Sequence, residues 1–185
     1  MRVIAGRYKG RVLKTVPDLS VRPATDRVKS AIFNVLQSRV DWSAATVLDL
    51  FAGSGSIGIE AMSRGAAKCV FVEQSRSALA FLKQNIDTVG AGSGALVVAG
   101  DVFGFLRTAH KRYEAVFADP PYALENLNDL PNIIFGAGVV AEEGYLIIEH
   151  PAGHVFTPGP AWETAVEKTY GRTCVSFFVH TRAPQ

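Results

Sequence analysis

The chain has 185 residues, of which 48% are hydrophobic and 19% are charged, and its net charge is only +2. This composition excludes a disordered chain, and no apolar run reaches the about 18 residues that a membrane-spanning helix needs. The first residues, MRVIAGRYKG, lack the apolar stretch of a secretory signal. We therefore expect a soluble, cytoplasmic protein with one sizeable core.

Basic residues are concentrated at the N-terminus. Residues 1–39 contain nine Lys or Arg and two acids, whereas residues 40–185 contain 10 basic and 15 acidic residues. The first segment is therefore +7 and the remainder −5, which favours a polyanionic partner for the N-terminal segment over a merely solvated surface. We accordingly expect a basic extension over 1–39 and a catalytic body over 40–185.

The extension begins with a predicted hairpin. Residues 2–16 indicate two short strands around a turn that contains Gly10. Such a turn would present Arg7, Lys9 and Arg11 to phosphate groups.

An amphipathic helix is predicted over residues 22–37. Pro23 and Thr25 suit its start, with Thr25 as the N-cap and Asp26 in the first turn. The apolar residues then recur at helical spacing, namely Val28, Ala31, Ile32, Val35 and Leu36.

Beyond residue 46 the pattern alternates between strands and helices, and the clearest helix is 76–89. Short apolar strands that alternate with helices predict a parallel sheet covered on both faces. The tail departs from this alternation, because two strands follow one another around Gly171 and predict an antiparallel hairpin. Residues 150–160 are predicted to be a loop. The predicted strands are 46–52, 68–73, 95–100, 113–119, 144–149, 163–170 and 174–181.

The two cysteines, Cys69 and Cys174, each lie within an apolar stretch. Buried thiols are therefore expected rather than a disulfide. No Cys/His cluster has the spacing of metal ligands, so we expect no metal.

A glycine loop, Gly53-x-Gly55-x-x-Gly58, follows the strand that ends near Ala52. Glycines permit a tight turn and the close approach of a ligand at the carboxyl end of a strand. Glu73 ends the next strand and suits ribose hydroxyls, and Asp101 follows the third strand near the expected adenine. The loop alone fits both an NAD enzyme and an adenosyl-methyltransferase.

Asp49 separates these two cofactors. It lies within the strand, four residues before the first glycine, where a carboxylate would repel a pyrophosphate. S-adenosylmethionine carries an ammonium and a sulfonium and no phosphate, so a carboxylate there is favourable. An acid paired with an unseen Arg or Lys is the structural alternative.

The sequence Asp119-Pro120-Pro121-Tyr122 directly follows the fourth strand of the body. Two prolines fix an extended turn and leave carbonyl groups without neighbouring donors. Asp119 and the Pro120 carbonyl can accept both protons of a nucleobase amine, while Tyr122 stacks on the base. A simple Pro-Pro turn capped by Asp119 is the alternative.

In this order, LDLFAGSGSIGIEA, FVEQ and DPPY resemble the class I S-adenosylmethionine-dependent methyltransferases of the amino-methylating kind. MRVIAGRYKGRVL followed by RPATDRVKSAIFNVL is similar, more specifically, to the RsmD family, whose members methylate N2 of a guanine in bacterial 16S ribosomal RNA. The resemblance implies a Rossmann-like α/β fold. It also implies a mostly parallel seven-stranded sheet with a C-terminal antiparallel hairpin, preceded by a small β-hairpin and helix.

The resemblance also implies roles for individual residues. The residues implied to contact the target base are Asp119, Pro120, Pro121 and Tyr122. The loop 123–132 would cover the base. The implied RNA contacts are Arg7, Lys9, Arg11, Arg22 and Lys29, although Ala24 interrupts the family's usual RPT. The implied cofactor site consists of Asp49, Phe51, Ala52, Gly53, Ser54, Gly55, Glu73, Gln74, Asp101 and Val102.

From these motifs we expect a monomeric enzyme that uses S-adenosylmethionine, releases S-adenosylhomocysteine and acts on 16S rRNA within a partly or fully assembled 30S subunit. An adenine-N6 DNA methyltransferase is the nearest alternative, because DPPY also suits an adenine amine. A non-catalytic RNA-binding assembly protein and an NAD-dependent oxidoreductase are further alternatives. Asp49 and Asp119 argue against both.

Overall fold

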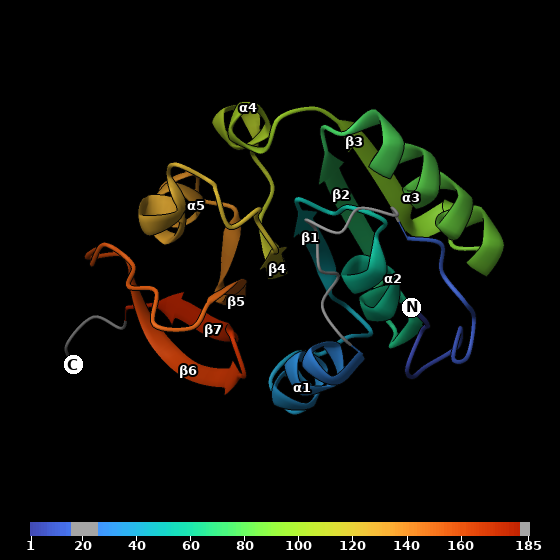
Figure 1. Ribbon diagram of the computed structural model, residues 1–185, viewed down its shortest axis with the longest axis horizontal. Coiled ribbons are helices and arrows are strands. Elements are labelled where there is room, and N and C mark those ends of the chain that lie inside the picture. The colour runs from blue at the N-terminus through green and yellow to red at the C-terminus, as the bar shows by residue number, and fades with distance from the viewer. Residues whose placement is uncertain (16–25, 182–185) are drawn as a thin grey trace.

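A computed structural model of the chain describes residues 1–15 and 26–181. Its centre is a seven-stranded sheet with the order β3-β2-β1-β4-β5-β7-β6 (Figure 1). The first five strands pair in parallel, and β7 pairs antiparallel to both β5 and β6, which confirms the predicted fold class. The strands are β1 (Thr46–Leu50), β2 (Lys68–Glu73), β3 (Ala95–Ala99), β4 (Tyr113–Ala118), β5 (Val140–Pro151), β6 (Trp162–Tyr170) and β7 (Thr173–His180).

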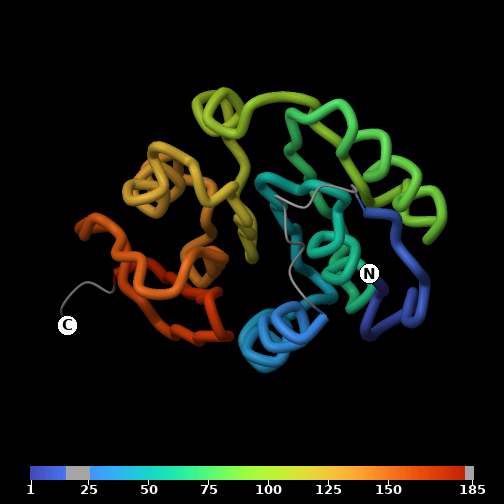
Figure 2. Tube along the Cα trace, viewed as in Figure 1, coloured from blue at the N-terminus to red at the C-terminus, as the bar shows by residue number. Residues whose placement is uncertain are grey.

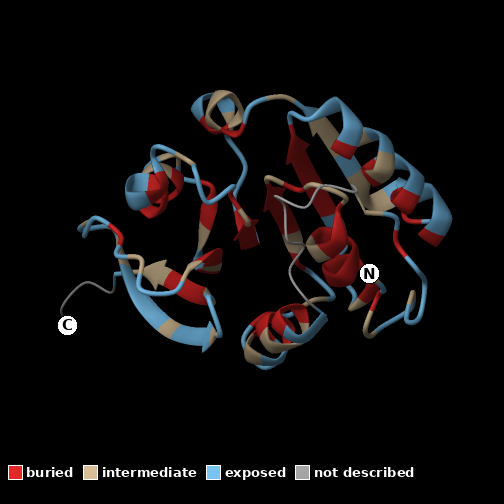
Figure 3. Ribbon diagram, in the orientation of Figure 1, coloured by how far each residue is buried: buried red, intermediate tan, exposed pale blue. Residues whose placement is uncertain are grey.

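Helices cover both faces of the sheet, as Figure 1 shows. Because side chains alternate along a strand, odd-numbered Val47 faces one core cluster and even-numbered Leu48 faces the other. The first cluster lies beneath α1 (Asp26–Leu36), α2 (Ser56–Ser63) and α3 (Arg76–Val89). The second lies beneath α4 (Val102–Thr108) and α5 (Leu130–Gly136), whereas β6 is the largely exposed edge of the sheet (Figure 3).

Several boundaries differ from those predicted. The predicted loop 123–132 is wrong in its second half, because a 3₁₀ turn at Leu127–Asp129 leads into α5. Leu127 and Leu130 are buried in the second core cluster, and this burial stabilises helical structure there. Strand β5 begins earlier and ends later than the predicted 144–149. Pro23 and Thr25, predicted to start the first helix, lie outside the described residues.

The N-terminal hairpin, residues 2–13, lies along α2 (Figure 2). The two predicted strands are reduced to a single antiparallel bridge between Arg2 and Val12. The reason is that several hairpin amides bond to α2 instead: Arg7 N donates to the Ser63 carbonyl at 2.8 Å and Tyr8 N donates to Ser63 Oγ at 2.9 Å. The hairpin is therefore docked on the body of the protein.

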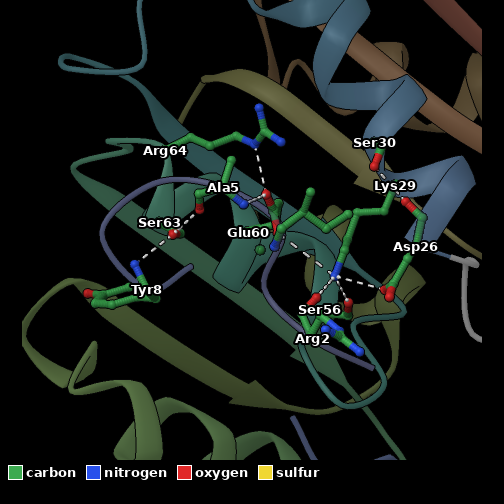
Figure 4. A network of polar contacts seen from close by, with 12 residues as sticks. Arg2, Ala5, Tyr8, Asp26, Lys29, Ser30, Ser56, Glu60, Ser63 and Arg64 are labelled. Atoms are coloured by element: carbon green, nitrogen blue, oxygen red, sulfur yellow. Dashed lines mark hydrogen bonds and ion pairs between the residues drawn. The ribbon is translucent and has the colours of Figure 1, made fainter. Parts of the chain in front are cut away.

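Glu60 of α2 is the main acceptor for this docking (Figure 4). Its carboxylate accepts from the amides of Ile4 at 2.8 Å and Ala5 at 3.1 Å, and from Arg64 Nε at 2.9 Å. The fully buried ammonium of Lys29 lies 3.8 Å from the same carboxylate. One buried charge pair thus joins the hairpin, α1 and α2.

No helix in the described part of the chain is long and apolar enough to span a membrane. Cys69 and Cys174 are both buried free thiols, as predicted.

Replacing Glu60 with Ala should lower the free energy of unfolding by about 3–5 kcal/mol, because the buried Lys29 would lose its buried partner and keep only the more exposed Asp26, 4.0 Å away. Urea denaturation measures this change, and amide exchange at Ile4 and Ala5 should accelerate. Glu142, which is exposed on β5, provides the control, and Glu142→Ala should change stability by less than about 0.5 kcal/mol. A loss below about 1 kcal/mol for Glu60→Ala would contradict the assigned role.

Candidate active site

Four acids lie at the carboxyl ends of four neighbouring strands, and we call them the carboxyl row: Glu73, Asp49, Asp119 and Glu149. In the order of the sheet, Glu73 ends β2, Asp49 lies in β1, Asp119 directly follows β4, and Glu149 lies in β5. Asp49 is in register with Phe71 and Phe117, and Phe117 is in register with Ile147. All three apolar residues belong to the core cluster beneath α1, α2 and α3. Because side chains alternate along a strand, the acid two residues after each of them faces the same side. These acids are Glu73, Asp119 and Glu149.

The four acids do not lie at the same height along their strands. Asp49 pairs with Phe71 and Phe117, so it lies two residues deeper than Glu73 and Asp119. A ligand is therefore expected above Asp49, at the carboxyl ends of β1 and β4. The strand order reverses at these two strands, which is the usual ligand position in an open α/β sheet.

The glycine loop turns above Asp49 in a strained backbone conformation. Phe51 has φ of 58° and is the one non-glycine residue with positive φ in the described ranges. Gly55 has φ of 81° and forms the N-cap of α2. Strained residues of this kind persist where the surrounding structure holds them, and they cluster at ligand sites.

Gly58 allows α2 to lie directly on β2. A Cβ atom at this position would come within 2.3 Å of the Phe71 ring and 2.6 Å of Cys69 Sγ. The Gly58 amide donates to Asp49 Oδ2 at 2.9 Å, so the helix start also orients the buried acid. This is the close helix–strand packing expected of the third glycine.

Burial raises the pKa of Asp49 well above its usual value, and the nearby charges of Asp119 and Glu73 raise it further. No Lys or Arg forms an ion pair with Asp49 among the described residues. Pairing of Asp49 with a basic side chain is therefore not found there. A buried carboxylate without a protein cation suits a positively charged ligand, which would lower its pKa again.

Glu73 organises the loop from the end of β2. Its Oε2 accepts from the Gly53 amide at 2.8 Å and its Oε1 accepts from the Ser75 amide at 2.7 Å. Each carboxylate oxygen can accept a further hydrogen bond, so these contacts leave capacity for ribose hydroxyls. The neighbouring Gln74 is exposed.

The predicted adenine region lies at the start of α4. Asp101 is the N-cap of this helix, and its Oδ2 accepts from the Gly104 amide at 2.7 Å. Val102 is buried, and Phe103 packs edge-on against Phe51 with ring centroids 6.5 Å apart. The structure thus brings an aromatic pair from the glycine loop and α4 to this side of the row.

The DPPY segment extends over the opposite end of the row. Pro120 is buried, Asp119 is half-buried, and burial raises the pKa of Asp119 to about 7. The exposed Tyr122 reaches towards the C-terminal strands, where its hydroxyl lies 3.0 Å from Thr173 Oγ1. The hydroxyl is therefore a positioning contact that leaves the ring surface available.

Two polar residues of the site were missed by sequence reasoning. Glu149 is buried at the end of the apolar run LIIE, and this burial, together with the charge of Asp119, raises its pKa to about 8. Asn85 lies on the buried face of α3, where its amide group donates to the carbonyls of Lys14 and Ser54, each at 2.9 Å. The detectable signal in both cases is a polar residue at a position that the surrounding pattern assigns to the core.

Lys29 corrects one of the predicted RNA contacts. Its side chain is fully buried and donates to the Arg2 carbonyl at 2.7 Å and to Ser56 Oγ at 3.0 Å, so it cannot lie on an RNA-binding surface. It reaches instead the first residue of α2, directly after the glycine loop. By contrast, Arg7, Lys9 and Arg11 are exposed, and Arg22 lies outside the described residues.

Comparisons with known proteins agree with this geometry. The family described as Conserved hypothetical protein 95 matches residues 1–179. YlbH of Bacillus subtilis, a candidate rRNA methyltransferase, is 38% identical over 96% of this chain and 98% of its own. Ribosomal RNA small subunit methyltransferase D of Escherichia coli (strain K12) is 33% identical over 100% of this chain and 91% of its own.

A solved structure is similar over the whole length. The candidate methyltransferase yhhF of Escherichia coli has a TM-score of 0.86 and 32% identity, and the match covers 97% of each chain. The chain therefore belongs to the family described as Conserved hypothetical protein 95, which is the RsmD family.

Proposed function

We propose that this protein transfers a methyl group from S-adenosylmethionine to the exocyclic N2 amine of a guanine in 16S rRNA of the small ribosomal subunit. The observation that carries the proposal is the carboxyl row, in which Asp49 lies below the glycine loop and Asp119 lies beside Tyr122. The name of the Escherichia coli relative supports ribosomal RNA as the substrate. The exposed basic residues of the hairpin support it independently.

The residues of the loop fit this cofactor. Asp49 supplies negative charge without a protein counter-ion, which favours a sulfonium and an ammonium over a pyrophosphate. Residues 51–55 supply the backbone cradle, with Ala52 and Ser54 between the residues of positive φ. Glu73 and Gln74 would meet the ribose, and Asp101 and Val102 the adenine. When bound, the cofactor supplies an activated methyl group and leaves as S-adenosylhomocysteine.

Asp119 is the group that acts on the acceptor amine. A nucleobase amine is a weak nucleophile because its lone pair is delocalised into the ring. An acceptor that holds an N–H proton favours pyramidalisation, and Asp119 then takes that proton as positive charge develops on the nitrogen. Pro120 and Pro121 hold the Asp119 backbone, and the ring of Tyr122 provides the stacking surface.

The hairpin would supply further RNA contacts on the side of the molecule where it packs along α2. Arg7, Lys9 and Arg11 are exposed, and the Arg7 guanidinium lies 4.6 Å from the centre of the Tyr8 ring. A hollow of about 270 Å³ separates the hairpin from the start of α1 and is lined in part by Arg2 and Lys9. Basic side chains around a hollow suit a phosphate backbone that follows the surface.

The reaction is tested with 30S particles, and separately with free rRNA, from cells that lack the gene. Incubation with tritiated S-adenosylmethionine should place label in 16S rRNA as N2-methylguanosine, identified by nucleoside chromatography. Free rRNA and particles report which form is the substrate. Label recovered as N6-methyladenosine would refute the proposal, and absence of any label would favour a non-catalytic RNA-binding protein.

Replacing Asp119 with Ala should leave S-adenosylhomocysteine affinity within about twofold while turnover falls by about 10²–10⁴-fold, because a proton acceptor is lost. Calorimetry measures the first quantity and the label assay the second. Glu143→Ala, at an exposed position near the start of β5, is the control for removing an acid. Lost cofactor affinity in a folded Asp119→Ala protein would assign Asp119 to the cofactor site instead.

Charge reversal at Lys9 and Arg11 should weaken rRNA binding and make its dependence on salt less steep, since each lost phosphate contact lowers the slope by about 0.7–0.9. Binding measured between low and moderate salt gives the slope. The matched control is charge reversal at Lys68 and Lys111, which are exposed on the body of the protein. A slope equal to that of the unmodified protein would remove the hairpin from the RNA-binding surface.

A further inference from the structure

Two acids of the carboxyl row have no hydrogen-bond donor within the described part of the chain. Asp49 accepts from Gly58, and Glu73 accepts from Gly53 and Ser75. No side-chain hydrogen bond or ion pair joins Asp119 or Glu149 to any other described residue. Glu149 is buried and Asp119 is half-buried, so these two neighbouring carboxyls can accept hydrogen bonds from a ligand that brings donors.

The register between β4 and β5 makes these two carboxyls neighbours. Ala118 of β4 is in register with Ile148 of β5, so Asp119, directly after β4, and Glu149 of β5 are the next residues on neighbouring chain segments. Adjacent strands lie about 4.8 Å apart, and the two side chains face the same side. Two acceptors at this spacing can bind neighbouring N–H groups on the edge of one base.

Tyr122 places a stacking surface above the same pair. Its hydroxyl contacts Thr173, which begins β7 and lies opposite Pro151 at the end of β5. Because the sheet order is β4-β5-β7, a side chain that starts after β4 and reaches β7 must cross the carboxyl end of β5. A base stacked on this ring would therefore lie over the carboxyl end of β5, beside Asp119 and Glu149.

Guanine and adenine differ in what they offer to such a pair. The Watson–Crick edge of guanine has N–H donors at both N1 and N2, whereas adenine has an amine donor beside an N1 acceptor. A carboxylate facing an N1 acceptor would be left buried and unpaired, which is the strongest basis for rejecting a substrate.

We propose that Glu149 is a second base-contacting residue, which accepts the N1–H of the target guanine while Asp119 accepts an N2–H. This inference rests on the proposed function and supplies the guanine preference that DPPY alone does not. In the reaction, the N2 lone pair forms the new N–C bond and the C–S bond breaks. One N2 proton passes to Asp119, and Glu149 keeps its hydrogen bond to N1–H throughout.

The electrostatics of the pair agree with this assignment. Burial and the charge of Asp119 raise the pKa of Glu149 to about 8, and burial raises that of Asp119 to about 7. Near neutral pH the two carboxyls therefore resist being ionised together. A base edge with two N–H donors stabilises the carboxylates of Asp119 and Glu149 at the same time. Water, or a base edge that presents an acceptor, stabilises them less well.

The test compares guanine with 2-aminopurine at the methylated position, once the label assay has located it. 2-Aminopurine keeps the N2 amine but has an unprotonated N1. Small-subunit particles reconstituted with ligated rRNA carrying either base are the substrates. For the unmodified enzyme, kcat/KM should be at least about 100-fold lower with 2-aminopurine, because Glu149 loses its donor.

Glu149→Gln replaces one acceptor oxygen with an NH2 donor that can meet the bare N1. This variant should lose at least about tenfold in kcat/KM with guanine, and its penalty for 2-aminopurine should shrink by at least about tenfold. S-adenosylhomocysteine affinity should stay within about twofold in both cases. Glu143→Gln, on the same strand at an exposed position, should leave every value unchanged.

A Glu149→Gln enzyme with the unmodified guanine rate and the full 2-aminopurine penalty would overturn the inference. If Glu149→Gln does not fold, the Glu149→Asp variant tests the inference instead. It keeps a carboxylate and should retain the preference for guanine at a reduced rate, and loss of that preference would overturn the inference. Failure of the proposed function is distinguished by the unmodified enzyme, which would then form no N2-methylguanosine on the guanine substrate.

Discussion

The buried carboxylate of Glu60 is the interaction on which the arrangement of this molecule most depends. It satisfies two hairpin amides and Arg64, and it lies beside the ammonium of Lys29. Charges removed from water are tolerated only with such compensation. Glu60 is therefore an attachment point that the hairpin, α1 and α2 share, and the glycine loop immediately precedes α2.

Parallel strands with acids at their ends create a negatively charged edge of the sheet. The body of the protein uses this edge in two ways. Asp49 and Glu73 are oriented by backbone amides and suit a ligand that must be held in one position. Among the residues that the structure describes, Asp119 and Glu149 have no such partners, and they suit a base whose protons change during the proposed reaction. The contrast between bonded and unbonded acids separates the cofactor side from the acceptor side.

Much of this arrangement could be predicted from the sequence, because the strands are short apolar runs and the loop residues are chemically distinctive. The helix 76–89 and the strand 68–73 have their predicted bounds. Glu149 and Asn85 stand out as polar residues in apolar patterns, but their roles could not be predicted, since these depend on which strand or loop lies alongside them. Lys29 was misassigned because a lysine on an amphipathic helix is usually exposed, whereas Glu60, 31 positions later, provides a buried partner.

The close contact at Gly58 has a mechanical consequence. On one side α2 is fixed to β2 with no room for a Cβ atom, and on the other side Glu60 and Ser63 hold the hairpin. The helix is thus a rigid spacer between the sheet and the basic surface. Any side chain added at residue 58 would push the spacer outwards and shift Lys9 and Arg11 together, so a substitution in the core would alter the alignment of the surface with the carboxyl row.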